Sequence, residues 1–151
     1  MIPYIRQRLH YQLNYKFTEL IQLKTFIEGV FTNYWQQERA KGYLVGITGK
    51  WGRDKFPIKL SMSGSWFDTD NYDTRSYIYE PGLTYAYSMY SFYGKGTRLA
   101  VNTSCSIGKW CVCQAKWGWT HYFDRNTISS GLEEISGNNK MDLQLQLYIR
   151  W

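Results

Sequence analysis

The chain has 151 residues, of which 44% are hydrophobic, 19% aromatic and 20% charged, and this length suits one folded unit. A mean hydropathy of −0.48 and the lack of an apolar run of about 18 residues exclude a membrane-spanning helix. The 7 Trp, 14 Tyr and 7 Phe argue against disorder, and 3 Cys are too few for a disulfide-framed miniprotein. The net charge of +6 favours an anionic partner.

The first residues do not have the pattern of a secretory signal. Residues 1–5 are followed at once by Arg6 and Arg8, whereas a signal peptide has a basic start, an apolar stretch and a small-residue cleavage site. Because the features below point to export, we expect an export signal to have stood upstream of residue 1.

The strongest pattern is the alternation of apolar and polar residues. At 5–17 the odd positions are apolar or aromatic except for Gln7, and the even positions are all polar. Residues 141–151 repeat the pattern. Successive side chains of a strand point to opposite faces, so each segment is predicted to be a strand with one apolar and one polar side.

The same pattern predicts about seven long strands and a shorter pair around the turn Pro81-Gly82. Because the links are too short for crossovers, the strands are expected to be antiparallel. The predicted fold class is all-β, an antiparallel up-and-down transmembrane β-barrel or open barrel segment with a short extracellular hairpin, with residues 1–151 as one unit. The predicted long strands are 5–17, 21–35, 43–51, 56–67, 97–106, 110–123 and 141–151, and the shorter pair is 75–80 and 83–92.

The links between the long strands alternate strictly between short and long. Outer-membrane barrels have this asymmetry, with short periplasmic turns and long outer loops. The short links surround residues 18–19, 52–55 and 107–109, and the long, polar, glycine-bearing links span 36–42, 68–96 and 124–140.

Strand length and aromatic placement favour a membrane barrel over a soluble one. A tilted strand needs about 10 residues to cross the hydrocarbon, and the predicted strands reach that length. Aromatic residues gather at both strand ends, as they do at the two membrane–water interfaces. The tier beside the long links contains Trp35, Tyr43, Trp66, Trp119 and Phe123, and the tier beside the short links contains Phe17, Trp51, Phe56, Trp110 and Trp151. The aliphatic band between the tiers contains Leu9, Leu23, Ile27, Val45, Ile47, Leu60, Met62, Val101, Ala115 and Leu145.

The polar sides of the strands carry many more cations than anions. In a membrane barrel this side lines a wet lumen, where charges keep their hydration, so the lumen is predicted to be electropositive and to favour anions. Glu28 and Asp142 are predicted to pair with neighbouring cations. The predicted lumen-lining residues are Arg6, Arg8, His10, Lys24, Glu28, Lys50, Arg98, Lys116 and Arg150.

Several stretches resemble known families. Residues 141–151, with alternate apolar residues and a terminal aromatic, resemble the carboxyl-terminal assembly signal of Gram-negative outer-membrane barrels. The sequences FDTD at 67–70, YGKGTR at 93–98 and SGLEEI at 130–135 resemble the barrel end of large outer-membrane proteins that carry helix-hairpin-helix motifs near their amino terminus. The resemblance extends over nearly the whole chain from Tyr4. It implies an outer-membrane location, with the lipid bilayer and the barrel-assembly machinery as partners, and it implies no DNA-binding role because the helix-hairpin-helix part has no counterpart here.

Strand direction predicts a segment rather than a whole barrel. If the short links are periplasmic, the chain ends in the periplasm, and an odd number of strands makes the first one start outside the cell. A complete bacterial barrel starts in the periplasm and has an even number of strands. We therefore expect this chain to be the carboxyl-terminal part of a larger barrel.

Three cysteines lie on two neighbouring predicted strands. Matching the apolar sides across the short link puts Cys105 opposite Cys111, with Cys113 two residues further along the same face. Thiolate metal sites usually have four ligands, and no His is near in sequence, so no metal site is predicted. The cysteines are interpreted as small residues on the lipid-facing side, and a Cys105–Cys111 disulfide is the alternative.

No other motif predicts chemistry. The acidic residues of 68–73 lack the spacing of a calcium loop, and 94–97 lacks the first glycine of a nucleotide-binding loop. His10 and His121 are the two imidazoles, and neither has a nucleophile at a spacing that predicts a catalytic pair. The chain is therefore predicted to be neither an enzyme nor a cofactor-binding protein.

The predicted function is a membrane-embedded pore or surface scaffold with an electropositive lumen and anionic solutes as candidate ligands. The first alternative is a soluble antiparallel β-barrel that binds an apolar small molecule in its core. The second is a basic β-barrel that binds nucleic acid by aromatic stacking, for which the sequence offers no specific evidence.

Overall fold

The computed structural model describes residues 4–34, 39–52, 56–86, 89–129 and 131–149. Within them no helix is long and apolar enough to cross a membrane. The strands are β1 (Tyr4–Lys16), β2 (Ile21–Tyr34), β3 (Ala40–Trp51), β4 (Ile58–Thr69), β5 (Ser76–Tyr79), β6 (Met89–Phe92), β7 (Gly94–Ile107), β8 (Cys111–Tyr122), β9 (Thr127–Ile128), β10 (Ile135–Ser136) and β11 (Asn139–Ile149). The 3-10 turns are η1 (Tyr72–Thr74) and η2 (Gly131–Glu133).

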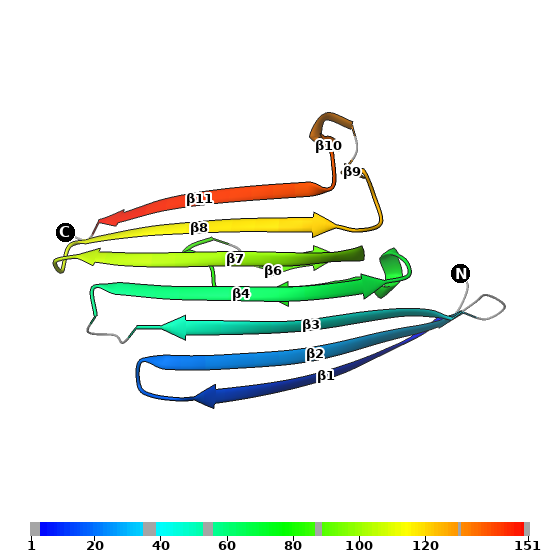
Figure 1. Cartoon of the computed structure of the whole chain (residues 1–151), viewed down its shortest axis with the longest axis horizontal. Helices are drawn as coiled ribbons and strands as arrows, with labels where there is room; N and C mark the ends of the chain where they lie inside the picture. Colours follow the sequence, from blue (N-terminus) through cyan, green and yellow to red (C-terminus); the bar gives the residue numbers. More distant parts are fainter. Residues whose placement is uncertain (1–3, 35–38, 53–55, 87–88, 130, 150–151) are drawn as a thin grey trace.

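The seven long strands form one antiparallel up-and-down sheet in the order β1-β2-β3-β4-β7-β8-β11 (Figure 1). Each long strand pairs with the next long strand along the chain, whether the link between them is short or long. The predicted all-β antiparallel fold class is confirmed. The sheet is not closed, because β1 and β11 are its two edges and are not paired with each other in the described residues.

The bounds of the long strands agree with the prediction to within three residues, and the second short strand, predicted at 83–92, is observed only as Met89–Phe92. Among the long strands the largest differences are at the starts of β3 and β7, which begin at Ala40 and Gly94. Both extensions contain glycine and interrupt the apolar alternation, so they resemble loop sequence. The backbone ladder continues through them because it needs only N–H and C=O groups, not a particular side chain.

The register fixes which side chains share a face of the sheet. His10 is paired with Glu28, and Glu28 with Leu44, so these residues lie on one face, which we call the inner face. Tyr11 is paired with Ile27, and Ile27 with Val45, on the opposite or outer face. Partners in an antiparallel ladder point to the same side. By the same register all the predicted aliphatic band residues lie on the outer face.

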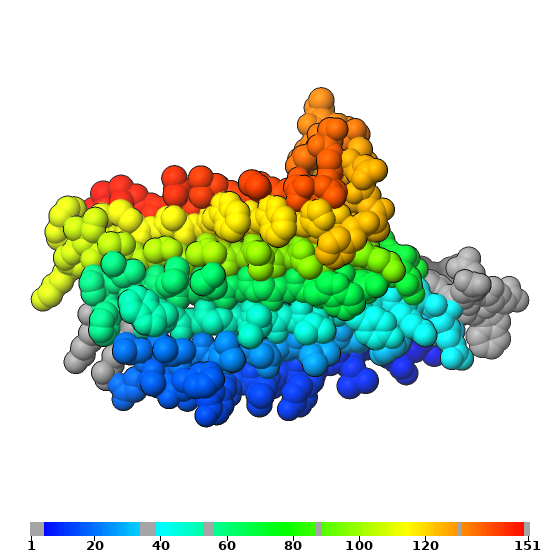
Figure 2. Space-filling model, in the orientation of Figure 1, coloured from blue at the N-terminus to red at the C-terminus, as the bar shows by residue number. Residues whose placement is uncertain are grey.

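Residues 70–86 and 89–93, here called the inner segment, cross the inner face of the sheet. The segment contains η1 and the antiparallel pair β5–β6, which lies behind the large sheet in Figure 1. The predicted short strand pair is thus present, and it packs against the inner face of the sheet, where Ile78 and Phe92 are buried in the core. Figure 2 shows the opposite side of the sheet, formed by side chains of the long strands.

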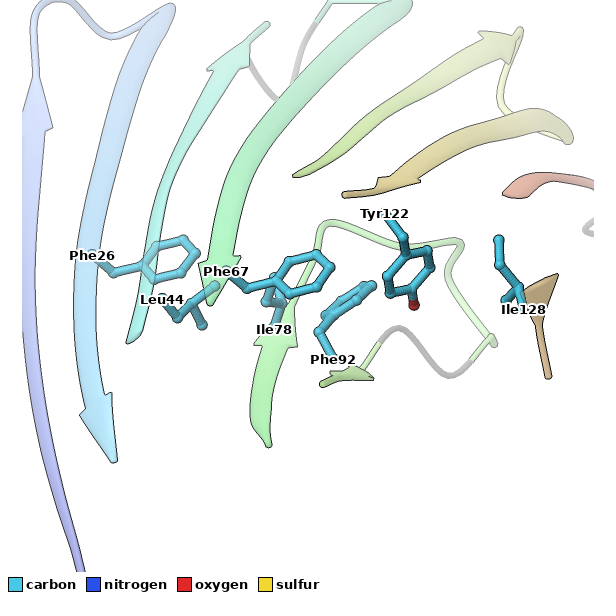
Figure 3. Packing of buried hydrophobic residues seen from close by; sticks show 7 residues of the cluster. All are labelled: Phe26, Leu44, Phe67, Ile78, Phe92, Tyr122 and Ile128. Atoms are coloured by element: carbon cyan, nitrogen blue, oxygen red, sulfur yellow. The ribbon is translucent and has the colours of Figure 1, made fainter. Parts of the chain in front are cut away.

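The hydrophobic core lies between the inner face and the inner segment. Figure 3 shows the sheet curving around β5 and β6, whose side chains point toward those of the sheet. The ring centroids of Phe67 and Phe92 are 4.9 Å apart, and those of Phe67 and Tyr122 are 5.7 Å apart. Burial of one such side chain stabilises a fold by about 1.5–3 kcal/mol. The core cluster consists of Phe26, Leu44, Phe67, Ile78, Phe92, Tyr122 and Ile128.

The short links are closed by local hydrogen bonds and by turn residues. Thr18 Oγ1 accepts from the backbone N–H of Leu20 at 3.2 Å and of Ile21 at 3.1 Å. Gly108, between β7 and β8, has a φ of 64°, a conformation that glycine adopts without steric cost. These two tight turns join β1 to β2 and β7 to β8 as antiparallel hairpins.

Candidate functional site: the inner face

A buried ion network joins the inner segment to the sheet. The Arg98 guanidinium donates to both carboxylate oxygens of Glu80, which follows β5. Lys116 Nζ lies 3.0 Å from Glu80 Oε2, within ion-pair distance, although its geometry does not satisfy a hydrogen bond among the described residues. The Arg98, Lys116 and Glu80 side chains are 2%, 0% and 1% exposed. Charged side chains that are buried to this extent are stable only when they are paired with groups of opposite charge.

The sheet supplies the remaining partners of Arg98. Its Nη1 donates to Asp142 Oδ1 of β11 at 2.8 Å and to Thr120 Oγ1 of β8 at 2.9 Å. The predicted pairing of Asp142 with a neighbouring cation is therefore present. Gly118 provides the space for it, because a Cβ there would lie 2.6 Å from both Arg98 Nη2 and Asp142 Oδ2.

Tyr90 covers the two buried cations. Its ring centroid lies 4.3 Å from Arg98 Cζ and 4.7 Å from Lys116 Nζ. An aromatic face attracts a cation, and more strongly once water is excluded. Tyr90 of β6 and Glu80 together hold the inner segment over the two cations.

The inner segment is also fixed close to β3. The side chain of Asn71 accepts from the backbone N–H of Thr74, and the Thr74 hydroxyl accepts from the backbone N–H of Asn71, so the two residues form a capping box around η1. A Cβ at Gly42 would lie 2.5 Å from the Thr74 carbonyl oxygen. Only a residue without a side chain lets η1 come so near to the sheet.

A second group of predicted lumen residues lies on β1 and β2. Glu28 is buried, and its carboxylate lies 3.5 Å from Arg8 Nε and 3.3 Å from His10 Nδ1. The pairing predicted for Glu28 is therefore present. Arg6 Nη2 donates to the backbone carbonyl of Arg75 at 3.1 Å, so β1 also contacts the inner segment.

A third group lies on the inner face near the short links. Lys24 Nζ lies 5.7 Å from the centroid of the Phe26 ring, and Lys50 is exposed at the end of β3. Eight of the nine predicted lumen residues thus share the inner face. The ninth, Arg150, lies outside the described residues. Arg98 and Lys116 differ from the prediction of a hydrated charge, since the inner segment encloses them.

The predicted aromatic tiers occupy both ends of the outer face. Tyr43 and Trp66 lie toward the long links, and Trp51 packs on Phe56 beside a short link with ring centroids 6.3 Å apart. Trp119 lies beside a long link and Trp110 in a short one, while Trp35 and Trp151 lie outside the described residues. The band between the tiers is not purely aliphatic, because it also contains Tyr11 and Trp117.

The predicted register of the cysteines is wrong by two residues. Cys105 is paired with Cys113, and Cys111 is paired with Ile107. The turn at 108–110 is shorter by one residue pair than the apolar sides suggested, since Ile107 still belongs to β7 and pairs with Cys111. All three cysteines lie on the outer face as free thiols, so the alternative Cys105–Cys111 disulfide is not formed.

Beyond β8, an ion pair holds the start of β7. Arg125 Nη2 lies 2.8 Å from Asp124 Oδ2 and donates to the Tyr93 carbonyl oxygen at 3.1 Å. The hydrogen bond from Arg125 lowers the pKa of Asp124 below its ordinary value and outweighs burial, which raises it. The same hydrogen bond raises the pKa of Arg125.

Glu80 and Tyr90 complete the buried network, and neither is among the predicted site residues. A signal for Glu80 existed, because Ser76, Ile78 and Glu80 alternate, and a strand with Ile78 facing the core places Glu80 on the same side. No comparable signal marks Tyr90 among the 14 Tyr of the chain.

Among the residues that the structure describes, no group of three or more His, Cys, Asp or Glu is arranged to hold a metal ion. Comparisons of the chain with protein-family models, with curated proteins and with solved structures found no match.

Proposed function

We propose that this chain forms part of the wall of a β-barrel in an outer membrane, with its outer face against lipid and its inner face lining a pore or supporting a surface platform. The proposal includes no catalytic role. It is supported mainly by the outer face, where large apolar side chains are exposed along every long strand. Leu9 is 73% exposed, Leu145 72% and Ile47 47%.

The distribution of charge supports the same proposal. A soluble sheet normally turns its apolar side to the core and its charges to water. Here the apolar outer face is exposed. The inner face, which carries the charges, is covered by the hydrophobic core and the inner segment. Exposed apolar patches of this extent mark a surface that contacts lipid or another molecule.

The edges of the sheet are consistent with a larger barrel. β1 and β11 each present an unpaired edge in the described residues, and a spanning sheet in lipid must satisfy all its backbone groups. We propose that further strands pair with these edges and close the barrel, as the strand direction leads us to expect.

The alternative, a soluble barrel with an apolar ligand in its core, receives less support. It requires the apolar stripe to face inward, whereas Leu9, Ile47 and Leu145 face away from the inner segment. Its inner face would also have to hold an apolar ligand beside Arg98, Lys116 and Glu28.

Two outer-face isoleucines of equal exposure allow a direct test. Ile47 lies midway along β3 and is 47% exposed, and Ile58 lies beside a short link at the start of β4 and is 46% exposed. Lysine at the bilayer midplane costs about 2–4 kcal/mol of stability and about 0–1 kcal/mol near the interface. We expect Ile47→Lys, measured by denaturant unfolding of the full-length protein in liposomes, to be far more destabilising than Ile58→Lys. Equal and small effects of both substitutions, as expected on a water-exposed surface, would refute the proposal.

A further inference from the structure

A cavity of about 320 Å³ lies on the inner face where β1, β2 and β3 approach their short links. These three strand ends lie together at one end of the sheet (Figure 1). The volume is within the range of about 300–1,000 Å³ that small-molecule sites occupy. A neighbouring cavity of about 450 Å³ shares Gln22 and Lys50 with it, so the two are continuous along the inner face.

The backbone register arranges three lysines of the smaller cavity around Gln22. Lys16 is paired with Gln22, and Gln22 with Lys50, so these residues form one row across β1, β2 and β3. Lys24 lies two residues along β2 on the same face, diagonal to both other lysines. Diagonal neighbours are about 7–8 Å apart, and a lysine carries its ammonium on a long, flexible stem. All three ammonium groups can therefore reach one ligand.

The three positive charges have no compensating carboxylate in the lining of the cavity, as far as the structure describes it. Lys16 and Lys50 are exposed and Lys24 is half-buried, and none of the three forms an ion pair with a described residue. Glu19, in the adjoining short link, has another interaction and is not a lining residue. A concave site lined by one sign of charge concentrates ions of the opposite sign.

The neutral side chains of the cavity add further donors. Asn14 Oδ1 accepts a hydrogen bond from Gln12 Nε2 at 3.2 Å, and this contact leaves the Asn14 Nδ2 group to donate elsewhere. The Gln22 amide, exposed at the centre of the three lysines, can donate as well. A ligand with several negatively charged oxygens fits such a set of donors, since charge-assisted hydrogen bonds to phosphate or carboxylate oxygens are the strong ones.

We propose that this cavity binds the diphosphate group of a water-soluble compound, with Lys16, Lys24 and Lys50 on the phosphate oxygens. One phosphate group carries about 1.5–2 negative charges at pH 7, so two linked groups balance three ammonium charges more closely than one does. The cavity opens on the inner face, away from the apolar outer face, which favours a soluble compound over a lipid. The site deepens the proposed function, on which it rests for its place beside a pore, by naming a ligand class for the inner face.

Calorimetric titration of the full-length protein in detergent, without divalent cations, tests the site with pyrophosphate and inorganic phosphate. We expect pyrophosphate to bind at least about tenfold more tightly, because the larger anion engages more of the three lysines. Lys24→Gln and Lys50→Gln are each expected to weaken pyrophosphate binding about tenfold, the effect of losing one charge-assisted contact. Lys109→Gln is the matched control, since Lys109 is exposed in the short link between β7 and β8 and does not line the cavity.

Equal weakening by Lys109→Gln and Lys24→Gln would mean non-specific attraction to net charge and would overturn the site, as would the absence of pyrophosphate binding. Inorganic phosphate binding as tightly as pyrophosphate would overturn the diphosphate assignment. ADP and farnesyl diphosphate carry the same group on a polar and on an apolar molecule. We expect ADP to bind at least as tightly as farnesyl diphosphate, and the reverse order would overturn the assignment to a soluble compound.

The Ile47→Lys and Ile58→Lys comparison on the same full-length protein separates failure of this site from failure of the membrane proposal. A protein that passes that comparison and does not bind pyrophosphate lacks only the site. One that binds pyrophosphate through Lys24 and Lys50 but fails the comparison lacks only the membrane role.

Discussion

Glu80 of the inner segment and Arg98 of β7 form a two-pronged ion pair that is closed off from solvent. The pair joins residues 18 positions apart in the sequence, across the gap between a short strand and the sheet. Because the same carboxylate also faces Lys116 at 3.0 Å, one side chain compensates two buried cations. Glu80 is therefore the main electrostatic contact between the inner segment and the sheet.

Replacement of Glu80 by Gln is expected to release the inner segment. Removal of one partner from a buried ion pair costs about 3–5 kcal/mol, because the remaining charges lose their compensation. Limited proteolysis should then cleave the Glu80→Gln variant within residues 70–93 at a protease concentration that leaves the parent intact. Glu133→Gln is the control, since Glu133 is exposed in η2. Equal protection of both variants would contradict the role of Glu80.

The Phe67 side chain is expected to contribute strongly to stability. It is 0% exposed and contacts Phe92 and Tyr122, so Phe67→Ala should reduce the free energy of unfolding by about 3–5 kcal/mol. Phe123→Ala, at a residue 58% exposed on the outer side, should cost much less in detergent. Denaturant unfolding followed by tryptophan fluorescence measures the free energy of unfolding of both variants. Similar losses of stability in the two would contradict the position of the core around Phe67.

The close approach of η1 to β3 can be tested with two glycines of one strand. A Cβ at Gly42 would clash with the Thr74 carbonyl oxygen at 2.5 Å, and a Cβ at Gly49 would meet nothing within 4 Å. Gly42→Ala is expected to destabilise the protein by about 1–3 kcal/mol, as overpacking does. Gly49→Ala is expected to be neutral or slightly stabilising. The difference in thermal unfolding midpoint measures the effect, and a smaller loss for Gly42→Ala than for Gly49→Ala would contradict this packing.

Acidification is expected to loosen the start of β7. Because Arg125 lowers the pKa of Asp124 in the folded protein, the pair stabilises the fold above the unfolded pKa of Asp, about 3.9. That contribution is lost as the pH falls through the lower folded pKa. Asp124→Asn should therefore lower the thermal midpoint at pH 7 but leave it unchanged at the acid end of the titration. A difference between parent and variant that persists at the lowest pH would exclude this ion pair as its origin.

Much of the fold was predictable because alternation of side chains is a local property. Each long strand carries its own two-sided pattern, and short links leave consecutive strands only antiparallel pairing. The outer-face positions of Leu9, Ile27 and Val45 follow from the alternation alone. Strand ends were less predictable at Ala40 and Gly94, where the ladder extends through residues without the pattern.

The candidate site was only partly predictable, because its assembly depends on contacts between distant segments. The alternation places Arg98 and Lys116 on the polar side, but it does not reveal that Glu80 and Tyr90 cover them. Phe26, Leu44 and Phe67 interrupt the polar side of their strands, and such interruptions are a sequence signal that something apolar packs there.

The sequence by itself determined seven two-sided strands, their antiparallel order and the sign of the charge on one side, since these follow from neighbouring residues. The tertiary structure alone decided that the inner segment lies against that charged side, that two of its cations are buried and paired, and that lysine-lined cavities remain beyond them. The physical reason is that burial and ion pairing depend on which distant side chains meet, and no local pattern encodes that meeting.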